Sequence, residues 1–264
     1  MIFPVGDDQV KGGFFPMFSY IFIGLNIAIF ILQFVSNPQT LLVCEYGSIP
    51  EEILRGEDLY TLFSSMFMHG GWMHLIGNML FLWVFADNIE ATVGPFIFVC
   101  FYLLGGLAAT AAHIFIGAVG VDVMDCCRVC ADPPCVGGVV ACAKSIPSVG
   151  ASGAISAVLG AYLLMFPKSQ VKLLVFYFMR TFKIPALLFL GFWIAQQMFS
   201  GIQSSLPGAS SGGVAWWAHI GGFVFGILFG IFFKNDSRVK AAREGRILKS
   251  DSNATSKGGG DSFV

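Results

Sequence analysis

The sequence predicts an all-α membrane protein, built as a bundle of six transmembrane helices, from its composition and from the lengths of its apolar blocks. Of the 264 residues, 56% are hydrophobic and 12% are charged. This charged share is about half that of ordinary soluble domains. The apolar residues fall into blocks of about 17–25, the length at which a helix crosses the bilayer core. Both observations argue against a soluble fold, a disordered chain and a nucleic-acid-binding protein.

Six apolar segments carry the predicted helices. They span residues 17–34, 72–85, 95–116, 152–166, 184–199 and 216–233. The second and fourth are short and interrupted by Gly and Ser, so we expect their helices to begin below the membrane surface. The six segments form a membrane domain over residues 17–233. It lies between an N-terminal segment, residues 1–16, and a basic tail, residues 234–264, that is expected to be disordered.

The basic residues set the expected orientation in the membrane. Lys and Arg gather before the first segment, between the fourth and fifth, and after the sixth. With six spans these residues fall on one side, and only Arg55, Arg128 and Lys144 are left on the other. Because positive charge is enriched in cytoplasmic loops, we expect both termini to be cytoplasmic.

Three groups of polar residues interrupt the apolar segments. They are His74 with Asn78 in the second segment, Ser152 in the fourth and His219 in the sixth. Polar side chains inside a membrane are energetically costly and therefore mark functional positions. The three segments run in the same direction, and each group lies near the outer end of its helix. The sequence thus predicts that these residues lie at one depth.

Small residues recur every fourth position in the fourth and sixth segments. They are Ser152, Ser156 and Gly160 in one, and Gly222, Gly226 and Gly230 in the other. Such faces let two membrane helices approach backbone to backbone. If the two faces meet, Ser152 and His219 lie together as a nucleophile and its base. Neither helix contains an Asp or Glu to orient the imidazole, so we expect a dyad rather than a triad.

His74 and Asn78 lie four residues apart, on one face of their helix. Two side-chain donors directed at one point, with the backbone N–H of Ser152, satisfy the requirements of an oxyanion hole. Each polar residue alone has a simpler explanation, such as a serine bonded to the carbonyl one turn back or a histidine that only packs. Their matched depth favours the catalytic interpretation.

The motifs around these residues resemble those of the rhomboid family of intramembrane serine proteases. They are HGGWMHLIGN over residues 69–78, GASG over residues 150–153 and AHIGG over residues 218–222, in the family's order. The resemblance implies the six-helix form of the fold. It implies an activity that needs no cofactor or metal. It also implies that Ser152 is the nucleophile, that His219 is the general base and that His74 and Asn78 line the oxyanion site. His69, where the family often has a supporting histidine, is given no catalytic role.

The function implied by this resemblance is that of a serine endopeptidase in the plasma membrane of a prokaryote. It would cleave transmembrane proteins near the outer leaflet, after local unwinding of the substrate helix. The expected partners are these substrates and the lipid bilayer, and no nucleic acid. The alternative is a rhomboid-like pseudoprotease that binds and sorts membrane proteins. The natural substrate, its pathway and the oligomeric state stay open.

Three features depart from the family pattern. Tyr60 and Thr61 stand where rhomboids often have Trp-Arg, and Ser156 stands where many members have an aromatic residue that stacks on the catalytic histidine. The stretch of residues 117–149 is longer than the usual connection.

A loop over residues 201–215, rich in Gly, Ser, Ala and Pro, precedes the sixth segment and is expected to act as a lid.

The long connection is rich in cysteine. It holds Cys126, Cys127, Cys130, Cys135 and Cys142. Zinc binding and disulfide formation are both open interpretations, and an outside location favours disulfides. We expect at least one disulfide within residues 126–142, with Cys44 available for the odd cysteine.

Overall fold

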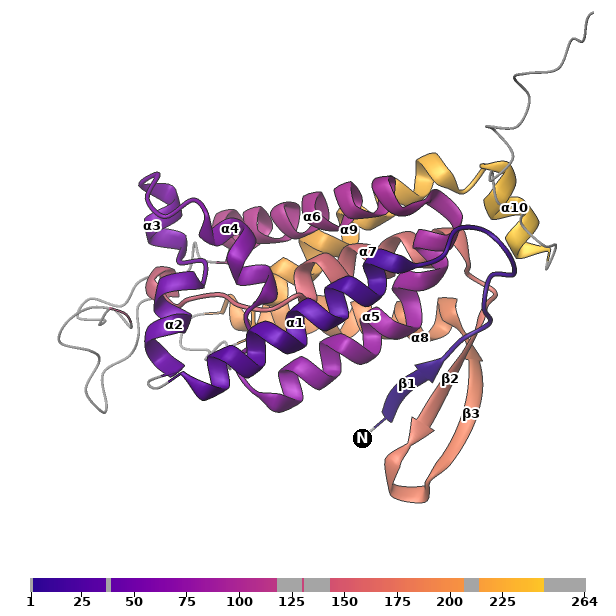
Figure 1. Ribbon diagram of the computed structural model, residues 1–264, viewed down its shortest axis with the longest axis horizontal. Coiled ribbons are helices and arrows are strands. Elements are labelled where there is room, and N and C mark those ends of the chain that lie inside the picture. Colours follow the sequence, from indigo (N-terminus) through magenta and orange to yellow (C-terminus); the bar gives the residue numbers. More distant parts are fainter. Residues whose placement is uncertain (1, 37–38, 118–129, 131–142, 207–213, 245–264) are drawn as a thin grey trace, which may run out of the picture.

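The computed structural model describes residues 2–36, 39–117, 130, 143–206 and 214–244, and it is mostly helical. Every segment predicted to be helical contains a long helix (Figure 1). These are α1 (Met17–Val35), α5 (Trp72–Val93), α6 (Pro95–Ala112), α7 (Ser152–Met165), α8 (Ala186–Ser204) and α9 (Trp216–Phe233). Shorter helices are α2 (Gln39–Tyr46), α3 (Pro50–Leu54), α4 (Thr61–Ser64) and α10 (Ser237–Arg243), with short turns η1 (Ser65–Phe67), η2 (His113–Gly117) and η3 (Ala143–Ser145).

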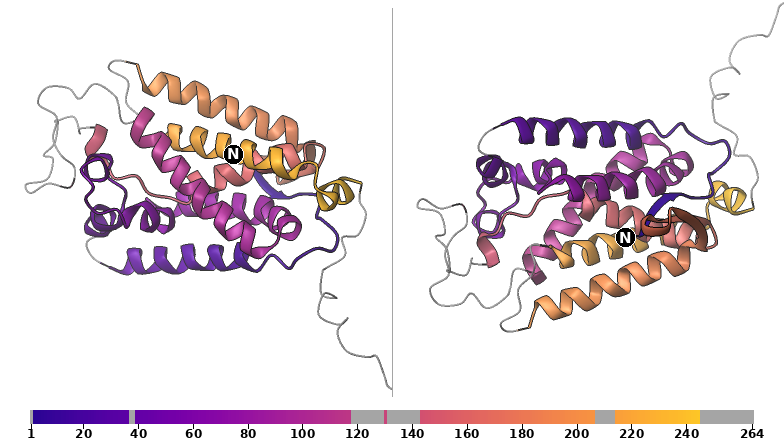
Figure 2. Two further views of the ribbon diagram at one scale, coloured as in Figure 1. Left: turned by 90° about the horizontal axis from the view of Figure 1, so that it is seen from above. Right: turned by 90° about the horizontal axis from the view of Figure 1, so that it is seen from below.

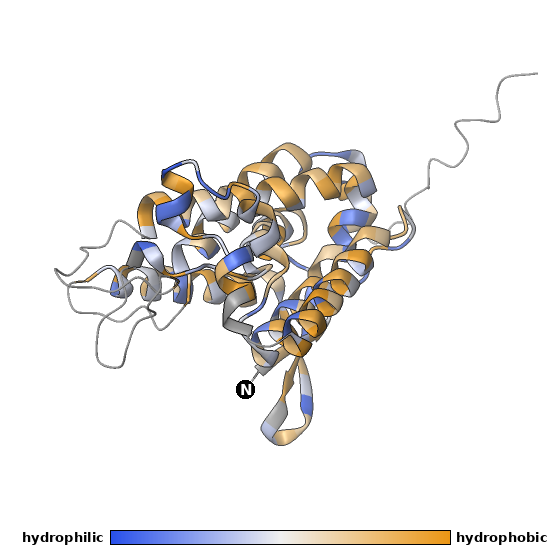
Figure 3. Ribbon diagram, turned by 60° about the vertical axis from the view of Figure 1, so that its left-hand side comes forward, coloured by the Kyte–Doolittle hydropathy of each residue, from blue (hydrophilic) through white to orange (hydrophobic). Residues whose placement is uncertain are grey.

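Three helical segments are long and apolar enough to cross a membrane. They are Met17–Val35, Pro95–Gly117 and Trp216–Phe233. The protein is therefore a membrane protein, and Figure 3 shows apolar residues along most of the helical surface. The six predicted spans stay a prediction. In the described part of the chain, none of α5, α7 and α8 is both long enough and apolar enough to be counted as a span by length and composition.

Helix α5 is longer than predicted, because its polar last turns are buried. The prediction ended at residue 85, but the helix continues to Val93. Glu90 is fully buried, and its carboxylate accepts hydrogen bonds from the backbone N–H groups of Phe18 and Ser19, at 2.9 and 2.7 Å. A negative group at a helix N-terminus satisfies free N–H groups and complements the helix dipole. Glu90 thus fixes the start of α1.

A three-stranded antiparallel sheet corrects the all-α prediction. Its strands β1 (Ile2–Gly6), β2 (Gln170–Val175) and β3 (Arg180–Pro185) lie in the order β1-β2-β3. A short turn, η4 (Phe176–Phe178), links β2 to β3. These strands have five or six residues, and such short runs give a weak signal beside apolar blocks of about 18 residues.

The N-terminal strand is fastened to the bundle through Asp7. The side chain of Asn88 donates to Asp7 at 2.7 Å, and the hydroxyl of Tyr162 donates to the same carboxylate oxygen. The side chain of Asn88 also accepts from the backbone N–H of Val10, at 2.8 Å. The segment of residues 1–16, predicted only as a stretch before the membrane domain, therefore bonds to both α5 and α7.

Helix α7 occupies the centre of the bundle, and α1 and α8 lie on opposite sides of it (Figure 2). A Cβ atom at Gly222 would collide with the carbonyl oxygen of Gly153, and one at Gly226 would collide with that of Ala157. The two helices therefore meet backbone to backbone, as predicted. The α7 residues nearest these two glycines of α9 are Gly153 and Ala157, each one position after a serine of the predicted face. This contact brings the first residues of the two helices together.

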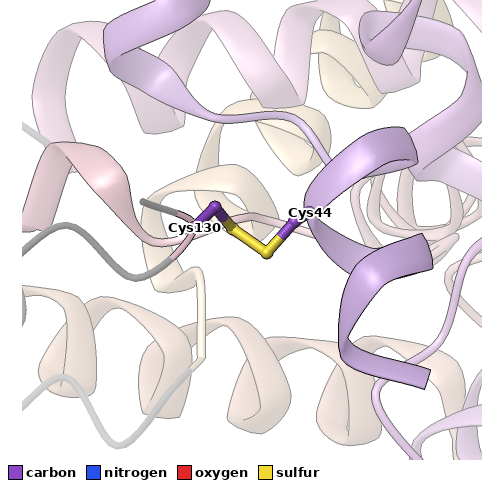
Figure 4. The surroundings of a disulfide bond; sticks show 2 residues. All are labelled: Cys44 and Cys130. Carbon is purple, nitrogen blue, oxygen red and sulfur yellow. A yellow bond between two sulfur atoms is a disulfide. The ribbon is translucent and has the colours of Figure 1, made fainter. Parts of the chain in front are cut away.

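A disulfide joins Cys44 of α2 to Cys130 (Figure 4). Cys44 was the expected partner for the odd cysteine of the connection, and Cys130 is that cysteine. A further cross-link within residues 126–142 stays a prediction. The bridge ties the cysteine-rich connection to the loop after α1. Cys126, Cys127, Cys135 and Cys142 lie outside the described residues.

Two other expectations fall partly outside the described residues. The predicted lid of residues 201–215 overlaps α8, which continues to Ser204, and residues 207–213 are not described. The basic tail, expected to be disordered from residue 234, begins instead with the helix α10. Asp236 caps this helix by accepting the backbone N–H of Arg238 at 2.8 Å. Residues 245–264 lie outside the described part.

Candidate active site

Ser152 and His219 lie side by side at the beginnings of their helices. Ser152 is the first residue of α7, and His219 lies in the first turn of α9. The Oγ atom of Ser152 is 2.9 Å from Nε2 of His219. A hydroxyl within hydrogen-bond reach of an imidazole is the arrangement in which the imidazole can take the proton as the oxygen attacks a carbonyl.

The other nitrogen of His219 is bound by Gln197 of α8. The distance from Nδ1 to Oε1 of Gln197 is 2.8 Å, and the Gln197 side chain is only 4% exposed. The amide nitrogen of Gln197 donates to the side-chain oxygen of Gln196 at 2.6 Å, which fixes the orientation of the amide. Because Oε1 only accepts, Nδ1 carries the proton and Nε2 is left to accept from Ser152.

Aromatic rings of two helices contact His219. The ring centroid of Trp193, on α8, is 5.9 Å away, and that of Trp216 is 6.2 Å away and perpendicular to the imidazole. Ser156, at the position where an aromatic residue is common, instead donates to the carbonyl of Ser152 at 2.6 Å. The aromatic rings near His219 thus come from α8 and α9.

His74 and Asn78 come together beside the turn that precedes Ser152. A Cβ atom at Gly150 would lie 2.7 Å from Nε2 of His74 and 3.6 Å from Nδ2 of Asn78. Gly150 also has a φ of +126°, which L side chains rarely adopt. Glycine at this position therefore satisfies a backbone requirement and leaves room for the two polar side chains.

Neighbouring groups orient both of these side chains. The backbone N–H of Gly70 donates to Nδ1 of His74 at 3.4 Å, so a neutral His74 carries its proton on Nε2, the atom that faces Gly150. The Nδ2 atom of Asn78 is 3.0 Å from Nε2 of His69, which leaves its second N–H available. Sequence reasoning gave His69 no catalytic role, at a position where the family often has a supporting histidine, and the structure shows it as a buried support.

His69 is itself held in place by helix α1. The side chain of Gln33 accepts from the backbone N–H of His69 and donates to its carbonyl, both at 3.0 Å. A chain of polar contacts thus runs from α1 through His69 to Asn78. Gln33 lies in a strongly apolar segment, and its isolation there was the only sequence signal for this role.

All four predicted site residues, Ser152, His219, His74 and Asn78, line one cavity of about 740 Å³. Its further walls come from the turn η1, from helix α6 and from residues 146–149. Within the described residues, no three His, Cys, Asp or Glu side chains lie close enough to hold a metal ion.

The match to known proteins covers most of the chain. A family model described as Rhomboid domain matches residues 56–235. The chain belongs to the rhomboid family. The family includes membrane-embedded serine proteases that act on transmembrane proteins. The resemblance inferred from the three sequence motifs is confirmed.

Individual relatives are distant and longer. The chain is 25% identical to Rhomboid protein 1, mitochondrial, of Saccharomyces cerevisiae over 213 residues, covering 80% of this chain and 51% of that protein. It is 27% identical to Presenilin-associated rhomboid-like protein, mitochondrial, of Bos taurus over 251 residues, covering 90% of this chain and 54% of that protein.

A bacterial relative matches a shorter stretch. It is Rhomboid protease GluP of Bacillus subtilis, 27% identical over 152 residues, which cover 56% of this chain and 24% of the relative. The chain thus spans about half, or less, of the length of these relatives. These relatives include both mitochondrial and bacterial proteins, so the comparison leaves the compartment of this chain open.

Proposed function

We propose that this rhomboid is an intramembrane serine endopeptidase that cleaves transmembrane proteins with Ser152 and His219. The observation that carries the proposal is the 2.9 Å contact between Ser152 Oγ and His219 Nε2. It lies in a cavity that His74 and Asn78 also line. The site combines a nucleophile bonded to its base with two donors aimed at one point. This arrangement suits acyl transfer better than a site that only binds a substrate.

In the proposed reaction His219 first accepts a proton from Ser152 and then donates it to the leaving group. Nε2 takes the hydroxyl proton of Ser152 while Oγ bonds to the substrate carbonyl carbon. When the peptide C–N bond breaks, His219 gives that proton to the leaving nitrogen, and an ester to Ser152 remains. Water then hydrolyses the ester with His219 again as base. Gln197, by accepting from Nδ1, holds the imidazole in the tautomer that this cycle requires.

The oxyanion that forms during attack is stabilised by His74 and Asn78. Nε2–H of His74 and the second N–H of Asn78 both face the space at Gly150, two residues before Ser152. The backbone N–H of Ser152, at the start of α7, is a third donor. A donor of this kind contributes about 3–4 kcal/mol of transition-state stabilisation in other acyl-transfer enzymes.

The substrate in this proposal is a transmembrane helix that unwinds near its outer end. A membrane helix satisfies its backbone groups internally, so a carbonyl reaches Ser152 only after local unfolding. Helix-weakening Gly, Ala, Ser or Pro near the cut site therefore favour cleavage. In this proposal both termini are cytoplasmic, because basic residues gather near the ends of the spans. The proposal also places the protein in the plasma membrane of a prokaryote.

Cleavage of a model single-span substrate in proteoliposomes tests the proposal. We expect wild-type protein to cleave it and Ser152→Ala to abolish cleavage. Ser204→Ala is the matched control, because Ser204 only donates to the carbonyl of Gly201 at the end of α8, and it should retain activity. Equal cleavage by wild type and Ser152→Ala, or no cleavage by wild type, contradicts the proposal. Binding of the substrate without cleavage would favour the pseudoprotease alternative.

A further inference from the structure

The hairpin of β2 and β3 extends from the bundle at the end opposite Ser152. Figure 1 shows that the hairpin projects at a large angle to the long helices. Both views in Figure 2 are along the length of the hairpin. Helix α7 ends at Met165, shortly before β2, and α8 begins at Ala186, directly after β3. The hairpin therefore starts at the level where two helices of the bundle end, and it runs across that level.

The two faces of the hairpin differ in polarity. Residues paired across antiparallel strands point to the same side, and Leu173 pairs with Phe182. Their face also carries the pair of Val171 and Ile184. Val171 and Leu173 are almost completely buried against the bundle, so this face is the one turned toward the helices.

The opposite face is more polar. It carries Lys172 paired with Lys183 and Leu174 paired with Thr181. The two lysines occupy directly opposed positions, which is an unfavourable pairing unless both amines reach water. The polar face is therefore turned away from the bundle, toward solvent.

Apolar side chains of this face and of the turn between the strands are exposed beyond the part that the bundle covers. Phe182 is 42% exposed, Phe178 68%, Met179 71% and Tyr177 85%. We call Tyr177, Phe178, Met179 and Phe182 the hairpin tip. Exposed apolar clusters of this kind mark contact with a membrane or a partner protein. Arg180, paired with Val175, lies on the same face as Phe182.

We propose that the hairpin tip rests on the bilayer, with its side chains in the headgroup region of the leaflet opposite the Ser152 end. Because Phe182 of the tip lies on the sheet face that packs on the helix ends, the tip is turned toward the lipid that surrounds those helices. Tyrosine and other aromatic rings are suited to this boundary, where one side is apolar and the other is wet. Arg180 is placed to bind lipid phosphate. The proposal is independent of the proposed protease activity.

Neighbouring tryptophan substitutions on the two faces test the proposal. Full-length Phe182→Trp and Thr181→Trp proteins are reconstituted in vesicles of phosphatidylcholine and phosphatidylglycerol, with and without bromine on the lipid chains near the headgroups. Bromine quenches only tryptophans that it contacts. After subtraction of wild-type emission, we expect most of the signal added by Phe182→Trp to be lost, and the signal added by Thr181→Trp to be retained.

Equal quenching at the two positions, or none at Phe182→Trp, overturns the proposal. Quenching of Phe182→Trp that is absent at a high ratio of protein to lipid and appears only on dilution into more lipid also overturns it, because the tip then contacts a second copy of the chain rather than lipid. Tyr177→Trp is a second probe, at a position where the native side chain is exposed. If Phe182→Trp fails to fold, quenching of Tyr177→Trp relative to Thr181→Trp decides the question.

Discussion

Gln197 determines which nitrogen of His219 is free to act as a base. Its oxygen accepts from Nδ1, and its own amide is held by Gln196. We expect Gln197→Leu to lower kcat about tenfold to a hundredfold, about 1.4–2.7 kcal/mol of transition-state stabilisation, with KM little changed. Gln197→Glu keeps an accepting oxygen and should retain more activity than Gln197→Leu. The measurement is steady-state cleavage of a single-span substrate in proteoliposomes.

The matched control for Gln197 is Gln203→Leu, since Gln203 lies on the same helix and is exposed. It should behave as wild type. A Gln197→Leu protein with wild-type kcat, in a preparation where Ser152→Ala is inactive, would show that the contact to Nδ1 does not position the imidazole. The proposed protease activity would then still stand.

Gly150 leaves room for the two proposed oxyanion donors. A Cβ at this position would lie 2.7 Å from Nε2 of His74, so we expect Gly150→Ala to displace His74 and to lower kcat about a hundredfold or more. Gly77→Ala, on the same helix as His74, adds a methyl group with no atom nearby and is the control. Thermal unfolding in detergent separates lost catalysis from lost folding. Unchanged turnover by a folded Gly150→Ala protein would contradict the assignment.

The positions of the four proposed site residues were predictable from the sequence, but their supports were not. Ser152, His219, His74 and Asn78 are isolated polar residues at one depth, and the small-residue faces indicated which helices meet. Gln197 and Trp193 were missed because the search for an orienting group considered only acidic residues in the fourth and sixth segments. The group comes from α8, and only the packing of α8 beside α9 brings it to His219.

At the scale of the elements, the N-terminal strand is joined to the bundle by a carboxyl group whose pKa is shifted. Burial raises the pKa of Asp7 to about 7, and the nearby Asp87 adds to this rise, although the hydrogen bond from Tyr162 lowers it. The ordinary value is 3.8, so folding favours the protonated form. The stability from this effect is fully present below about pH 4 and is lost as the pH rises toward 7.

We therefore expect Asp7→Asn, which cannot ionise, to remove part of the pH dependence of stability. Wild-type Tm should fall between pH 5 and pH 8 relative to that of Asp7→Asn. Asp8→Asn, which alters the exposed neighbouring carboxylate, is the control. Thermal unfolding at several pH values checks this. A difference between wild type and Asp7→Asn that stays constant across the range would mean that Asp7 does not titrate there.

At the scale of the whole molecule, most of the helices were predictable and the sheet was not. Blocks of apolar residues located the helices, because a bilayer requires long and nearly uniform segments. The polar end of α5 was missed because Asp87, Asn88 and Glu90 look like a loop until their buried partners are known. Strand β1 was missed because it pairs with a segment about 170 residues away in sequence. Strands β2 and β3 were missed because each has only six residues.

The disulfide is a covalent link between distant parts of the Ser152 end. It joins Cys44 to Cys130, which are 86 residues apart, and closing a loop of this size contributes roughly 4 kcal/mol by the loop-entropy estimate. We expect Cys44→Ser to lower the Tm measured without reductant, whereas Cys100→Ser, which removes a free cysteine, should not. Mapping of non-reduced peptides should show the Cys44–Cys130 pair in wild type. Equal Tm values for Cys44→Ser and wild type would show that the bridge contributes little.

The central claim is that His219 activates Ser152 for attack. A fluorophosphonate probe tests it directly, because it bonds covalently to a serine that a neighbouring base activates. The reconstituted protein is treated with the probe, and the modified peptide is identified by mass spectrometry. The account predicts an adduct on Ser152 in wild type and its loss in His219→Ala. No adduct on Ser152 in wild type, or the same adduct in His219→Ala, would contradict it.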